Sequence, residues 1–107
     1  MTDHTMKAFD NDLQDLLRMV AEMGGLAEKQ VADAVDALAK RDTALAQRVS
    51  AADSSIDDLQ HEIEEKAVLT IARRQPMAVD LREVVGTLRL ASDLERIGDL
   101  AKNIASA

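Results

Sequence analysis

Apolar residues recur every three or four positions along most of this 107-residue chain, and this spacing constrains its fold more than any other feature. Steps of three and four place side chains on one face of a helix that packs nearly parallel to its neighbours. The first series comprises Phe9, Leu13, Leu16, Val20, Met23, Ala27, Val31, Ala34 and Leu38. The second comprises Leu45, Val49, Ala52, Ile56, Leu59, Ile63 and Ala67. Two long helices are therefore predicted, one on each side of Arg41.

Composition favours the same class of fold. Phe9 is the only aromatic residue, so the core must be built from aliphatic residues and Met, which suit helix packing better than a sandwich or a barrel. The chain is predicted to be all-α, a long-helix, up-down-up three-helix bundle forming one domain over residues 1–107. The helices are expected at about 4–40, 42–74 and 78–105. Asp42 is the predicted N-cap of the second helix, and Pro76 follows its end.

Two features of these helices are less regular. Asp53, Ser54 and Ser55 are cap-forming residues inside the second helix, so a break is possible near residue 53. The third helix has two predicted apolar faces, which comprise Leu81, Val84, Val85 and Leu88 on one side, and Leu90, Leu94, Ile97, Ala101 and Ile104 on the other. One face closes the bundle. The other is expected to be covered by another chain or to carry a site.

Charge and chemistry exclude several classes of function. The net charge of −7 argues against binding duplex nucleic acid, because phosphate contacts need a basic surface. The chain has no cysteine, so thiolate metal ligands are excluded. No apolar run is long enough to span a membrane, and no targeting segment is recognisable, so a cytoplasmic protein is expected. No nucleophile–base pair or cofactor fingerprint points to an enzyme.

Glu95 and Asp99 are the strongest candidate site residues. They are four positions apart, so both carboxylates project from one face of a helix, and Asn103 lies one turn further on. Oxygen ligands of this kind suit a hard divalent cation such as Mg²⁺ or Mn²⁺, or iron. The alternative is an ordinary charged surface, in which Arg89 and Arg96 pair with acidic residues on neighbouring helices. The six acidic residues between Asp53 and Glu65 are interpreted as a solvated outer face.

Four stretches together carry a family resemblance. They are Met23-Gly24, then Asp53, Ile56, Asp57 and Leu59, then Gln75-Pro76 with Asp80-Leu81-Arg82, and finally the run from Ser92 to Asp99. In order and spacing the chain resembles the PhoU family of phosphate-uptake regulators. The resemblance implies a three-helix bundle in a cytoplasmic, usually dimeric protein. Such proteins act with the phosphate-specific ABC transporter and a membrane sensor kinase to damp phosphate uptake and repress the phosphate regulon.

The resemblance also assigns expected roles to residues. The family's acidic motif, which is associated with metal clusters in some members, maps onto Glu95 and Asp99. Its Asp-Leu-Arg stretch maps onto Asp80, Leu81 and Arg82, and Arg82 is the expected point of partner contact. Members carry two such three-helix repeats, and this chain is similar to the first alone. It is therefore expected to be part of a longer protein, or a one-repeat relative that pairs with itself or with another chain.

Two classes of function remain. The first is a regulatory binding module that docks on the ATPase subunit of the transporter or on the sensor histidine kinase, with or without a bound metal. The second is a purely structural module for helical self-association, in which the acidic residues are solvated surface. Neither class requires the chain to bind phosphate itself, and no cluster of basic residues predicts that it does.

Overall fold

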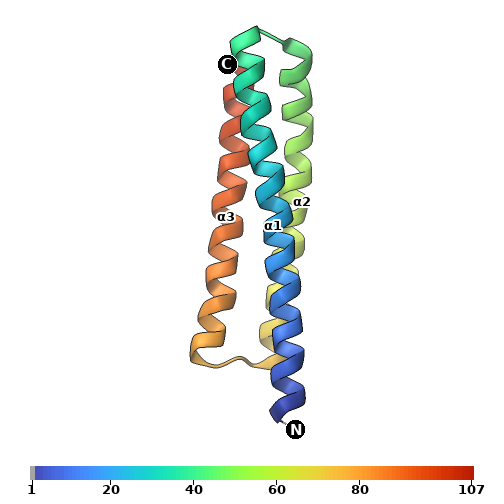
Figure 1. Cartoon of the computed structure of the whole chain (residues 1–107), viewed down its shortest axis with the longest axis vertical. Helices are drawn as coiled ribbons and strands as arrows, with labels where there is room; N and C mark the ends of the chain where they lie inside the picture. The colour runs from blue at the N-terminus through green and yellow to red at the C-terminus, as the bar shows by residue number, and fades with distance from the viewer. Residues whose placement is uncertain (1) are drawn as a thin grey trace.

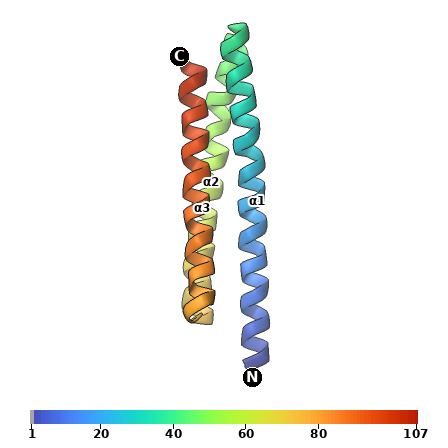
Figure 2. The ribbon, with the colours of Figure 1, turned by 60° about the vertical axis from the view of Figure 1, so that its left-hand side comes forward.

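Three long helices lie side by side in this computed structural model, which describes residues 2–107 and their side chains from residue 6 onward (Figures 1 and 2). They are α1 (Thr2–Lys40), α2 (Thr43–Arg74) and α3 (Ala78–Ser106). The helices run up, down and up, and each packs against both others in a rod 59 Å long. The predicted all-α three-helix bundle is therefore confirmed. None of these helices is both long and apolar enough to cross a membrane.

The buried residues of α1 alternate in steps of four and three from Leu16 to Ala37, and Phe9 lies seven residues before Leu16. The members of this buried face are Phe9, Leu16, Val20, Met23, Ala27, Gln30, Ala34 and Ala37. The prediction that Val31 and Leu38 belong to this buried face is wrong, because these residues are 37% and 53% exposed. The repeat of buried positions places Gln30 in the core instead of Val31. Gln30 Nε2 donates to the Val49 carbonyl oxygen of α2 at 2.8 Å, so the buried amide nitrogen is paired.

The turn between α1 and α2 is closed by backbone and side-chain hydrogen bonds. Arg41 has a left-handed conformation with φ of 52°, and the Asp42 N–H donates to the Ala37 carbonyl oxygen at 2.9 Å. This pattern ends a helix by satisfying carbonyl groups of its last turn. The Asp42 side chain then accepts from the Leu45 N–H at 3.0 Å, which confirms Asp42 as the N-cap of α2.

Helix α2 is continuous from Thr43 to Arg74, so the break considered near Asp53 does not occur. The Ser54 hydroxyl donates to the Ala51 carbonyl oxygen within the helix instead of capping a new one. The prediction of Ala52 as a core residue is also wrong. Ala52 is exposed, and Asp53 is buried in its place. An acidic side chain therefore occupies a position on the buried face of the bundle.

Helix α3 faces the other two helices mainly with small residues. Gln75 ends α2 in the left-handed conformation, Pro76 follows, and the buried residues of α3 are Val84, Thr87, Ala91, Gly98 and Ala101. The predicted division into two apolar faces is wrong. Each predicted face is divided between core and surface: Leu88 of the first and Leu94 of the second pack against the core. Leu81, Val85, Leu90 and Ile97 are exposed, and together with Leu100 they lie among charged residues on the outer side of α3. Small residues face the core because α3 lies close against its neighbours.

Candidate functional site

Four carboxyl groups come together where α2 and α3 touch. Asp53 and Asp57 lie on α2, and Glu95 and Asp99 lie on α3. Asp53 is buried, Asp57 and Glu95 are half-buried, and Asp99 is exposed. The group therefore extends from the interior of the bundle to its surface.

Asp53 is the innermost member, and its charge is poorly compensated. Only 5% of the residue is exposed, and its buried Oδ1 has no hydrogen-bond partner among the described residues. Burial raises the pKa of Asp53, and the negative charges of Asp57 and Asp99 raise it further. The nearby Lys102 ammonium acts in the opposite direction on that pKa. A buried, unpaired carboxylate oxygen destabilises the fold unless a proton or a cation reaches it.

Glu95 belongs to the same electrostatic group. Burial raises its pKa first, followed by the charges of Asp57 and Asp99. The neighbouring Asp57 carboxyl group, through hydrogen bonding, and the charge of Asp53 act in the same direction on the pKa of Glu95. Glu95 therefore holds its proton more firmly than an isolated glutamic acid does. Carboxyl groups of α2 and α3 thus act on one another.

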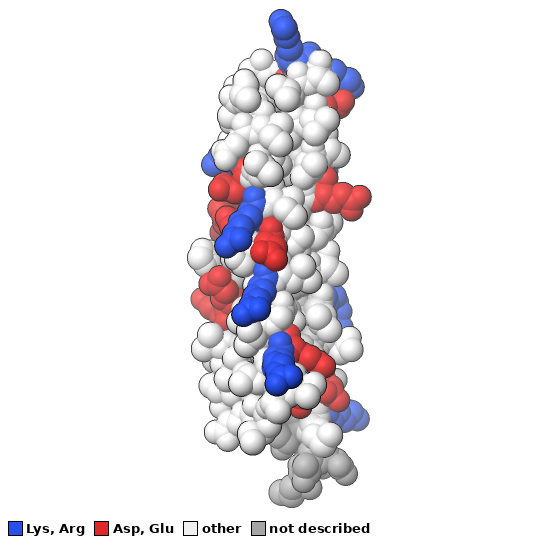
Figure 3. All heavy atoms as spheres, turned by 90° about the vertical axis from the view of Figure 1, so that its left-hand side faces the viewer, with Lys and Arg blue, Asp and Glu red and all other residues white. Residues whose placement is uncertain are grey.

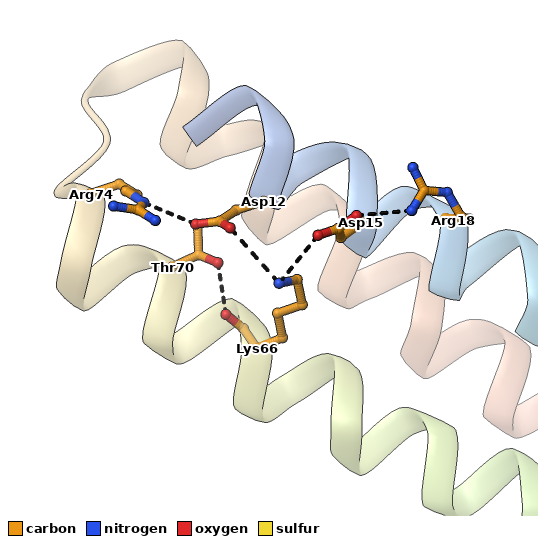
Figure 4. Close-up of polar contacts among 6 residues, drawn as sticks. All are labelled: Asp12, Asp15, Arg18, Lys66, Thr70 and Arg74. Carbon is orange, nitrogen blue, oxygen red and sulfur yellow. Dashed lines mark hydrogen bonds and ion pairs between the residues drawn. The ribbon is translucent and has the colours of Figure 1, made fainter. Parts of the chain in front are cut away.

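In a second polar cluster, between α1 and α2, the carboxylates are paired with basic side chains. Arg74 Nε donates to Asp12 Oδ2 at 3.0 Å, and Lys66 Nζ lies 3.8 Å from Asp12 Oδ1 and 3.6 Å from Asp15 Oδ2 (Figure 4). Arg18 also pairs with Asp15, at 2.9 Å. Here each carboxylate faces a cation, so the cluster serves to join the two helices. The carboxyl groups around Asp53 differ from this cluster, because they act mainly on one another, and burial and their charges raise the pKa of Asp53.

Sequence reasoning found one half of the acidic group and missed the other. Glu95 and Asp99 do lie together, whereas Asn103 is exposed one turn further along α3. The interpretation of Asp53 as part of a solvated outer face is wrong, because the residue is buried. The spacing could have predicted this burial, because Asp53 and Ile56 are three positions apart and therefore lie on the same, buried face of α2.

The alternative prediction, in which Arg96 pairs with an acidic residue of a neighbouring helix, is wrong. Arg96 Nη1 lies 3.9 Å from Asp93 Oδ1, which is on the same helix, and both side chains are well exposed. A pair of this kind contributes little to stability. Arg96 therefore leaves the Glu95 and Asp99 carboxylates uncompensated.

The donor chemistry of the acidic group fits a hard cation, since it consists of carboxylate oxygens. The unpaired Oδ1 of Asp53 is the kind of atom that a cation or its bound water would satisfy. Among the side chains that the structure describes, no three His, Cys, Asp or Glu residues converge closely enough to hold a metal ion as they stand. Binding would therefore require the more exposed carboxylates, Asp57, Glu95 and Asp99, to rotate inward.

The other predicted site residues, Asp80 and Arg82, are exposed at the start of α3. Arg82 lines a shallow groove with Ala78, Leu81, Val85, Gly86 and Arg89. Arg82, Arg89 and Arg96 are seven positions apart and exposed, so they follow one line along the helix. The face of the molecule in Figure 3 shows basic side chains along its length with acidic ones between them. Apolar and basic groups thus share the outer face of α3.

Comparison with known proteins relates the chain to one family. The model of the PhoU domain matches residues 20–107. A phosphate-specific transport system accessory protein PhoU homolog from Rhizobium meliloti is 58% identical over 95% of this chain and 43% of its own length. Homologs of the same name from Caulobacter vibrioides (strain NA1000 / CB15N) and Clostridium acetobutylicum are 55% and 44% identical, over 97% and 96% of this chain. They are covered over 45% and 48% of their own lengths, so the chain spans less than half of these curated relatives.

The buried carboxyl group makes a prediction about stability. The pKa of Asp53 is raised in the folded state, so the folded protein binds this proton more tightly than the unfolded chain, and the group destabilises the fold as pH rises above about 4. The substitution Asp53→Asn is expected to raise the free energy of unfolding at neutral pH by about 1 kcal/mol. The gain should shrink as pH falls towards about 4, because Asp53 of the parent takes up its proton at the raised pKa of the folded state.

Urea unfolding followed by circular dichroism across this pH range measures the effect. Asp58→Asn, which neutralises an exposed carboxyl group on the same helix, is the control and should change little. A variant Asp53→Asn that is less stable than the parent at neutral pH in metal-free buffer would contradict the assignment of Asp53 as an uncompensated buried charge.

Proposed function

This chain belongs to the PhoU family, and we propose that it is a regulatory module of phosphate transport that binds a divalent cation between α2 and α3. It acts by binding and not by catalysis. Support for the cation comes from the Asp53 carboxylate, whose buried Oδ1 has no partner among the side chains that the structure describes and whose pKa is raised by burial and by the charges of Asp57 and Asp99. Support for the role in phosphate transport comes from the names of the relatives.

Asp57, Glu95 and Asp99 are the proposed ligands, because they are more accessible than the buried Asp53 and interact with it electrostatically. Asn103 is the proposed source of one further oxygen. Mg²⁺, Mn²⁺ or iron would suit these donors, and the ion would supply positive charge at the contact between two helices. Asp53 would stabilise the ion from the inside through its charge. The ion's two positive charges would offset part of the repulsion among the four carboxylates of α2 and α3 and make this part of the bundle more rigid.

The proposed partners are the ATPase subunit of the phosphate ABC transporter and a sensor histidine kinase, with repression of phosphate uptake as the result. Docking would use Asp80 and Arg82 on the outer face of α3, where Arg82 is exposed beside apolar side chains. An exposed guanidinium group pairs well with a carboxylate on a partner. The protein would work in the cytoplasm, next to the membrane through its partners, and as a homodimer.

Titration with Mn²⁺ tests the cation directly. The chain is expected to bind Mn²⁺, as followed by calorimetry and by loss of the electron paramagnetic resonance signal of the free ion. The double substitution Glu95→Gln, Asp99→Asn removes two charged ligands and should weaken binding at least about tenfold. Asp93→Asn changes an exposed carboxylate on the same helix and should bind as the parent does. Equal affinity of the parent and the double variant would rule out these ligands.

Capture of purified transporter ATPase subunit and sensor kinase by the immobilised chain tests the docking surface. Arg82→Glu is expected to weaken capture about tenfold or more, because a buried or rim charge pair becomes a repulsion. Arg48→Glu is the matched charge reversal on α2, where the arginine is also exposed, and should capture normally. A chain that captures neither protein and forms a dimer unaffected by Mn²⁺ or EDTA would favour the structural self-association module instead.

A further inference from the structure

The contact between α2 and α3 at the acidic group depends on a missing side chain. Gly98 is buried, and a Cβ atom built on it would lie 2.8 Å from Ile56 Cδ1 and 3.4 Å from Asp53 Oδ1. Real Cβ atoms almost never approach another atom as closely as 2.8 Å. Gly86 on the same helix has no such neighbour within 4 Å. The close approach is therefore a local property of Gly98.

Ile56 has little room to move out of the way. It is 1% exposed and belongs to the main core cluster with residues of all three helices. Its branched Cβ restricts χ1 within a helix, so relief is confined to rotation about χ2, and a residue this buried has little free space for that rotation. A methyl group on residue 98 would therefore push α2 and α3 apart or strain the core around Ile56.

The positions of the carboxylates along the two helices match around this contact. On α2, Asp53 lies three residues before Ile56, and Asp57 directly follows it. On α3, Glu95 lies three residues before Gly98, and Asp99 directly follows it. The contact pair is thus flanked by two acidic residues on each helix, at the same spacing. The separation of Ile56 and Gly98 consequently sets the separation of the two acidic pairs.

We propose that Gly98 is a positioning residue for the cation site, because its missing side chain lets α2 and α3 approach closely enough for carboxylates of both helices to rotate onto one ion. The inference rests on the proposed cation site. Gly98 itself offers no side-chain ligand, so it acts only through the carboxylates of its neighbours. Small shifts of ligand geometry by supporting residues commonly change metal affinity about 10–100-fold.

Substitution of the glycine tests this role with the full chain and Mn²⁺ alone. Gly98→Ala is expected to weaken Mn²⁺ binding about tenfold, measured by calorimetry on folded protein. Gly86→Ala adds the same methyl group to the same helix in open space and should leave affinity unchanged. Adding Ile56→Val to Gly98→Ala removes the Cδ1 atom that the new methyl group meets, so the double variant should recover most of the affinity.

A purely structural role for Gly98 would give a different result, namely a change in stability without a change in Mn²⁺ affinity. Ile63→Val shortens another buried side chain of α2 and is expected to lower the unfolding temperature without changing Mn²⁺ affinity. If Gly98→Ala does not fold, the double variant is compared with Ile56→Val alone, and the two should bind Mn²⁺ within a factor of about two to three. A double variant that folds but binds as weakly as the cation-ligand variants would overturn the positioning role.

The outcomes also separate this inference from the proposed function. A parent chain that binds no Mn²⁺ would overturn both. A parent that binds Mn²⁺, together with Gly98→Ala that binds it equally well, would overturn the positioning role and leave the cation site standing.

Discussion

The close contact between Gly98 of α3 and Ile56 of α2 is the constraint on which the candidate site depends. Two helices that pack through ordinary side chains stay 8–10 Å apart, and small residues at a contact let them approach more closely. Gly98 has no side chain to keep α2 away, and Asp53 is packed against the same stretch of α3. As a result, carboxyl groups 40 or so residues apart in the sequence act on one another.

The rest of the bundle shows that this accumulation of negative charge is unusual for the chain. Gln30, a buried polar residue elsewhere, donates to the Val49 carbonyl oxygen. Asp12, a partly buried carboxylate, accepts from Arg74. The buried Asp53 Oδ1 has no comparable partner in the part of the chain that the structure describes. The fold therefore tolerates a local electrostatic cost where α2 meets α3, as is common at functional sites.

Sequence patterns predicted the fold class, because a steady three–four spacing and a core of aliphatic residues leave few alternatives to a helical bundle. They failed where a polar or small residue occupies the core. The apolar spacing favours Val31 over Gln30 and Ala52 over Asp53, whereas the structure buries the polar residue of each pair. The same preference fails on α3, where Gly98 and other small residues face the core while Leu90 and Ile97 are exposed. Glu95 and Asp99 were recognised from spacing within one helix. Their partners on α2 were not, because the relative register of two helices is set by packing.

The central claim is that carboxylates of α2 and α3 share one cation. A crystal structure of the chain grown with Mn²⁺, with an anomalous difference map recorded at a wavelength that excites manganese, tests it most directly. We expect a peak at the contact between the two helices, with a carboxylate ligand from Asp57 of α2 and at least one from Glu95 or Asp99 of α3. A manganese ion bound by α3 alone, or no peak at this contact in a crystal saturated with Mn²⁺, would contradict the claim.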